Sequence, residues 1–362
     1  MSQTSYAILG TVGVPGTYGG FETLAENLVR HHQKTSRTDE LTVYCSRRAY
    51  PTHPDCFLTA KLRYVPLSAN GAQSIPYDIW SLFAAVWRGS DSILLLGVSG
   101  AIALPLIRMF SHARIVTNID GIEWRREKWR GVARWFLRLS ERMAVRFSHH
   151  VVADNGGIAD YVTETYGLPC EVIAYGGDHA ISAVAKPYTG QNLPAAYAFA
   201  LCRIEPENNV GMILDAFALQ SEMPLVFVGN WNNSDYGRAL RTRFGNLAHI
   251  HMLDPIYDLG ILRYLRGNAV LYVHGHSAGG TNPSLVEMMH FGLPVLAFDC
   301  VFNRYTTEGK AIYFASVEQL AARISGLDAT QSTQTGAEMA RIARERYTWD
   351  AIGTAYFDLL AH

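Results

Sequence analysis

Residues 269–296 constrain the fold more than any other part of the sequence. An apolar run at 269–273 is followed by a glycine-rich turn, and Asn282 with Pro283 has the residue types of a helix start. Gly292 ends the expected helix, and a second apolar run follows at once. A strand, a helix and another buried strand in this order form a βαβ unit, whose two strands are parallel. A parallel sheet is therefore expected.

The rest of the chain repeats this alternation of short apolar runs and helical segments. At 362 residues, the chain is longer than one hydrophobic core usually supports. We therefore expect two α/β domains with parallel sheets, joined by a polar linker that ends near Pro194. The predicted strands are 6–9, 41–45, 93–96, 113–117, 151–153 and 171–175 in the first half, and 197–201, 225–228, 250–253, 269–273 and 294–298 in the second.

Composition excludes several classes of protein. A hydrophobic fraction of 49% and a formal charge of −1 are typical of a globular protein and not of a nucleic-acid binder. The five cysteines have no metal-ligand spacing, so we expect reduced thiols. The N-terminus has no basic segment typical of a signal peptide, and the uncharged run 92–107 is too short and too broken to span a membrane.

The glycine-rich loop at 275–282 predicts an anion-binding site, because a strand-to-helix turn presents free backbone N–H groups. Glu287 lies about one turn into the expected helix. There its carboxylate can accept hydrogen bonds from hydroxyl groups of the same ligand. A phosphate beside sugar hydroxyls is the chemistry of a nucleotide-sugar; an ordinary βα loop is the alternative. The predicted donor-binding residues here are Gly279, Gly280, Thr281, Asn282, Pro283, Ser284, Leu285 and Glu287.

A second glycine-rich loop, 10–20, follows the first strand. Its spacing differs from GxGxxG, and Pro15 interrupts it. An arginine pair after the second strand would suit a 2′-phosphate, so an NADP-dependent dehydrogenase is the alternative, but it leaves the second half unexplained. Glycines before a helix also let a sugar or phosphate approach the backbone closely. We assign Gly16, Gly19 and Gly20 to donor binding.

The segment 118–129 places carboxylates, an indole and guanidinium groups in one loop after a strand. These groups suit sugar hydroxyls, sugar stacking and phosphate contact. Asp120 is the first candidate for orienting or deprotonating the acceptor hydroxyl, and Glu22 is the second. A helix cap is the alternative role for Asp120. The predicted acceptor-binding residues are Glu123, Trp124, Arg125 and Arg126.

Two further features carry positive charge. Arg203 follows the strand 197–201, where it is positioned for a bidentate phosphate contact, with a structural ion pair as the alternative. Arginines also recur every four residues from Arg126 to Arg146, with aromatic residues nearby. This stripe predicts contact with an anionic membrane surface, and a solvated helix face is the alternative.

The motifs together resemble a known family. RIEPENN after a strand, GGTNPSLVEMMHFGLPV and YGGFETLAENL resemble GT-B glycosyltransferases of family 4. The combination of GTVGVPGTYGGFE, NIDGIEWRREKW, YGGD and HGHSAGGTNPSLVE resembles their bacterial rhamnosyltransferase branch, with a DUF1972-type N-terminal domain. The resemblance implies two Rossmann-like parallel-sheet domains facing across a cleft. Residues 1–179 would bind the acceptor, residues 180–345 the nucleotide-sugar, and residues 346–362 would form a helix crossing back to the first domain.

The resemblance also implies a function. The protein would be a retaining glycosyltransferase that moves L-rhamnose from dTDP-β-L-rhamnose to a lipid-linked saccharide in bacterial surface polysaccharide synthesis. It would act in the cytoplasm, as a peripheral protein at the inner face of the plasma membrane. No cofactor is expected, and since no Asp-x-Asp occurs, no metal is expected on the diphosphate. The alternatives are another donor sugar, a nucleotide-sugar epimerase or hydrolase on the same two-domain plan, and a non-catalytic sensor.

Two positions depart from the family pattern. Gly279 stands where the first acid of a Glu-x7-Glu pair is usual, so only Glu287 remains. Asn208, also assigned to donor binding, replaces a lysine five residues after Arg203. Arg203 would therefore be the main side-chain cation on the diphosphate, assisted by Gly280, Thr281 and the helix start.

Overall fold

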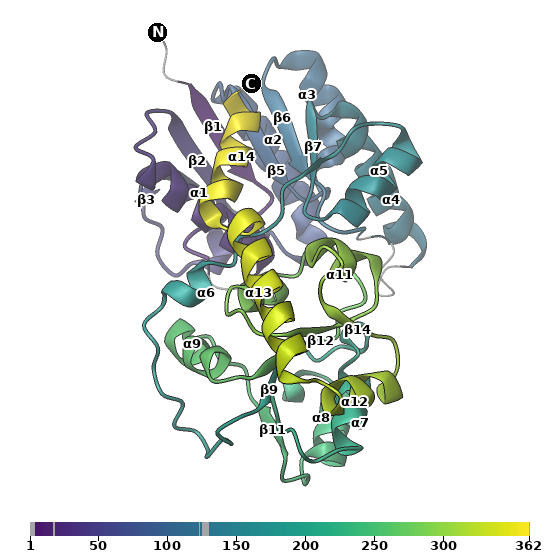
Figure 1. Cartoon of the computed structure of the whole chain (residues 1–362). Helices are drawn as coiled ribbons and strands as arrows, with labels where there is room; N and C mark the ends of the chain where they lie inside the picture. The colour runs from purple at the N-terminus through teal and green to yellow at the C-terminus, as the bar shows by residue number, and fades with distance from the viewer. Residues whose placement is uncertain (1–3, 17–18, 123, 125–129, 362) are drawn as a thin grey trace. The chain divides into compact units, whose positions relative to one another are not determined.

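The computed structural model describes residues 4–16, 19–122, 124 and 130–361. The chain divides into two compact units (Figure 1). Unit 1 comprises Met1–Ala174 and Trp349–His362, and unit 2 comprises Tyr175–Thr348. Each unit has its own sheet with helices on both faces, as expected of two Rossmann-like α/β domains.

Unit 1 contains a sheet with the strand order β3-β4-β2-β1-β5-β6-β7-β8. All neighbouring strands pair in parallel except β3 and β4, which are antiparallel. The central strands are fully buried, as their continuous apolar runs predict. The strands are β1 (Ser5–Leu9), β2 (Glu40–Ser46), β3 (Cys56–Phe57), β4 (Ala60–Val65), β5 (Ser92–Leu96), β6 (Arg114–Asn118), β7 (His150–Ala153) and β8 (Glu171–Val172).

The helices of unit 1 form two layers. The connection from β1 to β2 runs toward one edge of the sheet. The connections from β4 to β5, from β5 to β6 and from β6 to β7 run toward the other edge. Right-handed crossovers therefore place α1 on one face and α2, α3 and α4 on the opposite face. The helices are α1 (Gly20–Lys34), α2 (Ser74–Trp87), α3 (Leu104–Phe110), α4 (Gly131–Phe147) and α5 (Gly156–Tyr166), with short 3₁₀ turns at Arg47–Ala49, Gly71–Gln73 and Ala101–Ala103.

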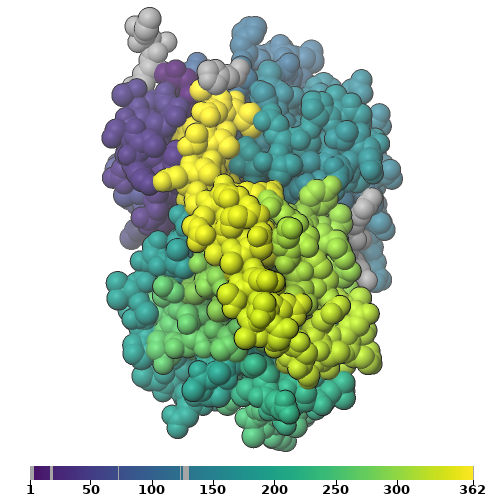
Figure 2. Space-filling model, in the orientation of Figure 1, coloured from purple at the N-terminus to yellow at the C-terminus, as the bar shows by residue number. Residues whose placement is uncertain are grey.

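The last helix, α14 (Trp349–Ala361), belongs to unit 1 although it follows unit 2 in the chain. It packs against α1, β5 and β6. Tyr356 and Phe357 are buried there, and the phenol oxygen of Tyr356 accepts a 2.6 Å hydrogen bond from the Asn118 amide. In Figure 2 the helix lies between the purple and teal segments of the same unit. The C-terminal segment is thus an integral part of the first core.

Unit 2 contains a parallel sheet with the strand order β11-β10-β9-β12-β13-β14. Its core is apolar and aromatic, with Phe199, Phe217, Phe227 and Trp231 fully buried. The strands are β9 (Ala198–Leu201), β10 (Leu225–Val228), β11 (Ile250–Leu253), β12 (Leu271–His274), β13 (Val295–Phe298) and β14 (Ile312–Phe314).

The helices of unit 2 also divide between two faces, with α7 and α8 on one and α9, α10 and α11 on the other by the same crossover rule. They are α6 (His179–Ser182), α7 (Val210–Ala218), α8 (Asp235–Phe244), α9 (Leu259–Gly267), α10 (Pro283–Met289), α11 (Val301–Thr306), α12 (Val317–Ser325) and α13 (Ala329–Arg346), with 3₁₀ turns at Pro206–Asn208 and Trp231–Asn233. In the described part of the chain, no helix is both long and apolar enough to cross a membrane.

Three strand predictions differ from the structure. The pair β3 and β4 was not predicted, because β4 alternates buried and exposed residues with a period of two and has no continuous apolar run. The predicted strand 171–175 is shortened to Glu171–Val172, since it pairs with β7 only at the edge of the sheet. The third difference is β14, a three-residue edge strand too short to be recognised in the sequence.

Candidate functional site

Each sheet has one point where the direction of the strand order reverses: between β1 and β5 in unit 1, and between β9 and β12 in unit 2. In open α/β sheets, ligands bind beyond the carboxyl ends of the strands at this point. In unit 2 the two loops that leave it are 202–209, after β9, and 275–282, after β12. Both contain predicted donor-binding residues.

Hydrogen bonds join these two loops of unit 2. The backbone N–H and hydroxyl of Ser277 both donate to the Glu207 carbonyl oxygen, at 3.1 and 2.7 Å. The Asn209 amide donates to the Gly275 carbonyl at 2.9 Å. A side chain at Gly275 would collide with the Asn208 backbone, so a glycine is required there. The loops after β9 and β12 therefore form one surface.

Arg203 lies on this surface with about half of its side chain exposed. The nearest carboxylate within the described residues, Glu205, is 3.8 Å away, which is the outer limit of an ion pair. A pair so exposed contributes little, so the guanidinium is available to a ligand. Asn208 has a different position: it is buried, and its amide donates to the Arg203 carbonyl at 2.7 Å. Its side chain thus fixes the loop that carries Arg203.

The start of α10 agrees with the sequence pattern. Asn282 is the N-cap, and its side-chain oxygen accepts hydrogen bonds from the Ser284 N–H at 3.0 Å and the Ser284 hydroxyl at 2.7 Å. Gly279 has a φ of 100°, a conformation that favours glycine. A glutamate at that position would be strained in this conformation. Thr281, within this loop, and Leu285, in α10, are both buried.

Two histidines lie under the loop. His274 and His276 stack with ring centroids 4.4 Å apart, and Nε2 of His274 and Nδ1 of His276 are buried with no hydrogen-bond partner among the residues that the structure describes. Burial lowers the pKa of His274 well below its usual range, and the neighbouring His276 lowers it further. Burial and the charge of Arg203 lower the pKa of His276 to about 3. Both rings are therefore neutral near pH 7, and His276 is close enough to Arg203 for the charge of the guanidinium to lower its pKa.

Glu287 has protein partners for both of its oxygens. Oε2 accepts from the guanidinium of Arg266, which is 2% exposed, and Oε1 lies 3.2 Å from Nε2 of His179. Burial raises the pKa of Glu287, but the charges of Arg266 and His179 outweigh it, and the pKa is below its usual range. A charged carboxylate thus lies between a buried guanidinium and an imidazole, and two contacts do not use all of the acceptor sites of a carboxylate.

The YGGD motif also lies against α10. A side chain at Gly177 would collide with the backbone of Val286 and Glu287, so the glycine lets this segment approach the helix closely. The Gly177 N–H donates to the Tyr347 carbonyl at 2.7 Å, and this approach brings His179 to Glu287. The motif therefore positions a partner of the predicted donor residue.

The glycine-rich loop of unit 1 is held by two carboxylates from α1. Glu22 is buried and accepts from the Val12 N–H at 2.8 Å and the Thr11 hydroxyl at 3.2 Å. Glu26 accepts from the Gly16 N–H at 2.8 Å. Gly19 has a φ of 131°, and a side chain there would collide with Glu22, while Gly20 is the first residue of α1. The carboxylates of Glu22 and Glu26 thus already accept hydrogen bonds from this loop.

Asp120 follows β6 with a φ of 57°, in the left-handed region that aspartate tolerates. Its N–H donates to the side-chain oxygen of Asn118 at 2.8 Å, and Asn118 is fixed by Tyr356. Burial raises the pKa of the Tyr356 hydroxyl, and the carboxylates of Asp154 and Asp120 raise it further. Two acids thus lie near one phenol at the carboxyl ends of β6 and β7. Asp154, missed from the sequence, stands in no recognised motif.

Of the predicted acceptor residues, Trp124 lies within the described structure, whereas Glu123, Arg125 and Arg126 lie outside the described residues. The indole N–H of Trp124 donates to Glu141 at 3.3 Å. Glu141, which is 2% exposed, also accepts from the hydroxyls of Tyr161 and Tyr166, each at 2.6 Å. The guanidinium groups of Arg134 and Arg138 both lie 5.3 Å from the indole ring. This buried carboxylate therefore fixes Trp124, the described aromatic residue that is predicted to bind the acceptor.

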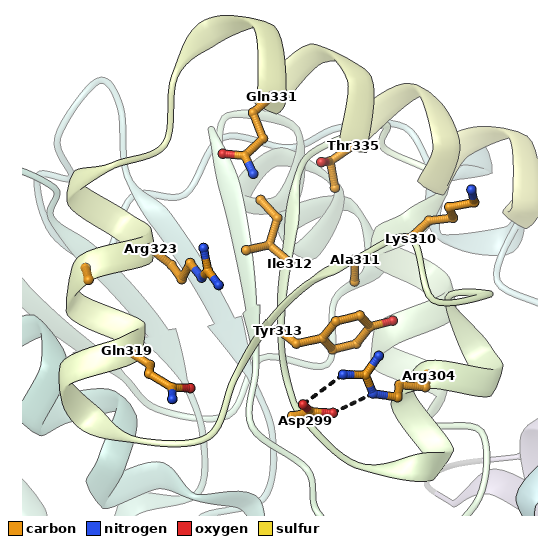
Figure 3. Close-up of a pocket in the computed structure, with 11 residues that line it drawn as sticks. Asp299, Arg304, Lys310, Ala311, Ile312, Tyr313, Gln319, Arg323, Gln331 and Thr335 are labelled. Carbon is orange, nitrogen blue, oxygen red and sulfur yellow. Dashed lines mark hydrogen bonds and ion pairs between the residues drawn. The ribbon is translucent and has the colours of Figure 1, made fainter.

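A cavity of about 730 Å³ lies along the edge strand β14, between α12 and α13 (Figure 3). Arg304, one of the cationic residues that line it, makes two hydrogen bonds to Asp299 at 2.6 and 2.8 Å and covers the ring of Tyr313. None of the predicted site residues lines it. In the parts of the chain that the structure describes, no group of three or more histidines, cysteines or acids is arranged to hold a metal ion.

Several residues that support the site had no signal in the sequence. Arg266 lies at the end of an ordinary amphipathic helix, and Glu26 and Glu141 resemble the solvated acids of any helix. Their roles depend on the tertiary structure, which brings each to a partner on another element. Only the histidines of the HGHS stretch stood in a recognised motif, and they were not assigned a role.

The sequence matches two family models. Residues 3–178 match the model described as "Domain of unknown function (DUF1972)". Residues 187–345 match the model described as "Glycosyl transferases group 1". No curated protein sequence matches the chain.

Solved structures share the fold over nearly the whole chain. A sucrose-phosphate synthase from Thermosynechococcus elongatus has a TM-score of 0.79 at 14% identity, over 99% of this chain and 98% of that chain. Anabaena Alr3699/HepE in complex with UDP and glucose has a TM-score of 0.68 at 15% identity, over 99% and 100%. A glycosyltransferase from Rickettsia africae ESF-5 has a TM-score of 0.72 at 11% identity, over 99% and 98%.

These likenesses establish the predicted α/β fold class, two Rossmann-like domains of the GT-B type. The glycosyl transferase model that matches residues 187–345 supports a glycosyltransferase that resembles family 4, whereas the solved structures show the fold alone.

Proposed function

We propose that this family 4-like glycosyltransferase moves L-rhamnose from dTDP-β-L-rhamnose to a lipid-linked saccharide, with retention of the anomeric configuration. The sugar and the acceptor are inferred from the resemblance of the GTVGVPGTYGGFE, NIDGIEWRREKW and HGHSAGGTNPSLVE motifs to bacterial rhamnosyltransferases. The product would enter a surface polysaccharide, and the enzyme would act as a peripheral protein at the inner face of the plasma membrane.

The observation that carries the proposal is the position of Arg203. It follows β9 at the switch point of the second sheet and is half exposed, and its nearest carboxylate among the described residues, Glu205, is 3.8 Å away. Glycosyl transfer requires stabilisation of the charge that develops on the departing diphosphate. A guanidinium can form two parallel hydrogen bonds to phosphate oxygens. The backbone N–H groups of Gly280 and Thr281 would add further donors, because their loop is bound to the loop of Arg203.

No step of this proposal requires a metal or another cofactor. Since the sequence contains no Asp-x-Asp, the residues that would bridge a metal to the diphosphate in other transferases are missing. Arg203 and the backbone donors then carry the negative charge of the leaving group. Transfer should therefore continue in excess EDTA.

In the proposed mechanism, Asp120 orients or deprotonates the acceptor hydroxyl, which attacks from the side of the leaving group. Asp120 is preferred to Glu22 because Glu22 is buried and already holds the Val12 N–H. Glu287 would accept a hydrogen bond from a donor hydroxyl while Arg266 and His179 hold its orientation. Asn208 would act through Arg203, whose loop it fixes.

The test is incubation of the protein with dTDP-β-L-rhamnose and with a panel of other nucleotide-sugars, with and without a lipid-linked saccharide. We expect acceptor-dependent release of dTDP and a product whose new linkage keeps the donor's configuration. Free rhamnose would indicate a hydrolase, an isomerised nucleotide-sugar would indicate an epimerase, and binding without turnover would indicate a sensor. Transfer from another donor alone would keep the reaction class but refute the sugar.

A further inference from the structure

The outer face of the helix layer α2, α3 and α4 is unusually apolar for a surface. The three helices contact one another in sequence, α2 with α3 and α3 with α4, on the sheet face opposite α1. Their outward side chains include the indole of Trp87, 91% exposed, and the ring of Phe110, 77% exposed. The exposed apolar residues of this layer, here called the α2–α4 face, are Trp80, Phe83, Trp87, Leu106, Met109, Phe110, Val132 and Trp135.

The spacing on each helix shows that these residues form continuous stripes. Trp80, Phe83 and Trp87 are spaced i, i+3 and i+7, and Leu106, Met109 and Phe110 are spaced i, i+3 and i+4. Residues at these spacings lie on one side of a helix. Neighbouring helices in one layer therefore present a contiguous apolar surface to solvent, whereas scattered single residues would need no explanation.

The charge on the same face has only one sign. The segments 74–88, 101–112 and 130–149 contain only two carboxylates, Asp78 and Glu141, and both are buried. All of the arginines in these segments are exposed, namely Arg88, Arg108, Arg130, Arg134, Arg138, Arg142 and Arg146. An apolar surface studded with cations and free of exposed anions is complementary to an anionic bilayer. A protein interface, by contrast, excludes charge from its apolar centre.

We infer that the α2–α4 face inserts its aromatic side chains into an anionic lipid bilayer. The arginines lie among the apolar residues, so their guanidinium groups reach the headgroups while their stems cover apolar surface. Tryptophan is suited to the membrane–water interface, because its apolar ring can lie among the lipids while its N–H donates to polar groups there. The contact therefore extends beyond the arginine stripe of α4 and includes α2 and α3. The inference rests on the proposed function, which places the acceptor in a membrane.

Insertion and charge attraction respond differently to salt. Attraction between exposed charges is screened over about 8 Å at physiological ionic strength and over shorter distances in more salt. Burial of indole and phenyl rings is not screened. Binding by this face should therefore have a salt-sensitive part, due to the arginines, and a salt-resistant part, due to Trp87, Met109 and Phe110.

The experiment is co-sedimentation of the full chain with phosphatidylcholine vesicles, with and without phosphatidylglycerol, at about 0.15 M and about 0.5 M salt. We expect wild type to pellet with the anionic vesicles and to remain partly bound in high salt. W87S/F110S should bind at least tenfold more weakly and lose the salt-resistant part. R142E/R146E should lose the preference for anionic vesicles. The control L219S/Y257S changes two exposed apolar residues of unit 2 and should bind like wild type.

Three results would overturn the inference: unchanged binding of W87S/F110S, equal binding of wild type to both vesicle types, or self-association that W87S/F110S abolishes, which would identify a second copy as the occupant. Acceptor-independent dTDP binding, measured without vesicles, should be the same in every variant. If wild type binds dTDP but does not pellet with anionic vesicles, the surface alone is refuted. Vesicle binding without sugar transfer from any donor refutes the proposed function alone.

Discussion

The two units both have loops at the switch point of a parallel sheet, but the groups that hold these loops differ in charge. In unit 1, the N–H groups of Val12 and Gly16 are bound by the carboxylates of Glu22 and Glu26. In unit 2, the loops after β9 and β12 are held by the neutral side chains of Ser277 and Asn209, and Arg203 is exposed beside them.

This difference in charge distinguishes two glycine-rich loops, 10–20 and 275–282, that look alike in the sequence. Both are rich in glycine and both precede a helix, so both were predicted to bind the donor. A loop lined by carboxylates repels a phosphate, whereas a loop with an exposed guanidinium attracts one. We therefore assign the diphosphate to unit 2. The charge of the side chains that hold a glycine-rich loop is therefore a better guide to phosphate binding than the number of its glycines.

The largest expected effect concerns the ion pair beneath the unit 2 site. Replacing Glu287 with Gln leaves the guanidinium of Arg266, 2% exposed, without its counter-charge. The free energy of unfolding should fall by about 3–5 kcal/mol, measured by urea denaturation. The double variant E287L/R266M should recover most of this loss, because it removes both charges. As a control, D215N breaks an exposed pair with Arg243 and should cost under about 1 kcal/mol. A stable E287Q would show that Glu287 is not needed to neutralise Arg266.

The second effect tests the assignment of the diphosphate. Replacing Arg203 with Ala removes a charge-assisted phosphate contact of about 1.5–3 kcal/mol. Affinity for dTDP should fall by roughly 10- to 150-fold in calorimetric titration. The control R241A removes an exposed arginine of the same unit that is paired with Asp254, and it should bind dTDP normally. Equal affinity of R203A and wild type would remove Arg203 from the donor site.

The third effect is a dependence of stability on pH. His274 and His276 are neutral in the folded protein because burial lowers both pKa values, but they take up protons in the unfolded chain below about pH 6.5. The unfolded state therefore binds more protons, and stability falls as the pH falls from about 6.5 toward the folded pKa. Each histidine should contribute a slope of about 1.4 kcal/mol per pH unit. In H274Q/H276Q, urea denaturation between pH 6 and 4 should show a flatter slope; an unchanged slope would contradict the neutral pair.

The smallest effect sharpens the contrast with unit 1. Replacing Glu26 with Gln weakens its hydrogen bond to the Gly16 N–H and breaks its ion pair with the exposed Arg30, and should cost about 0.5–1.5 kcal/mol of stability. Affinity for dTDP should stay the same if, as we propose, the diphosphate binds unit 2. If the glycine loop of unit 1 were the phosphate site, removal of this negative charge would tighten dTDP binding. Calorimetry therefore distinguishes the two assignments.

Most of the fold could be predicted from the sequence, because helix starts and buried strands are marked by residues that are close together in the chain. The start of α10 at Pro283 with Asn282 as its cap, and the alternation of buried strands with helices, agree with the structure. Elements that depend on pairing at a sheet edge, such as β14, could not be found from apolar runs. The site was predicted as a set of loop residues, but their partners were not, because Arg266 and His179 reach Glu287 from elements distant in the sequence.

The most direct test of the account is hydrogen exchange of the backbone amides with and without dTDP. If the diphosphate binds unit 2, exchange should be slower in residues 202–209 and 275–287, whose loops form the proposed diphosphate site, and unchanged in residues 10–22. R203A should lose this protection at a dTDP concentration that protects wild type. Protection confined to residues 10–22 would place the nucleotide in unit 1 and contradict the central claim.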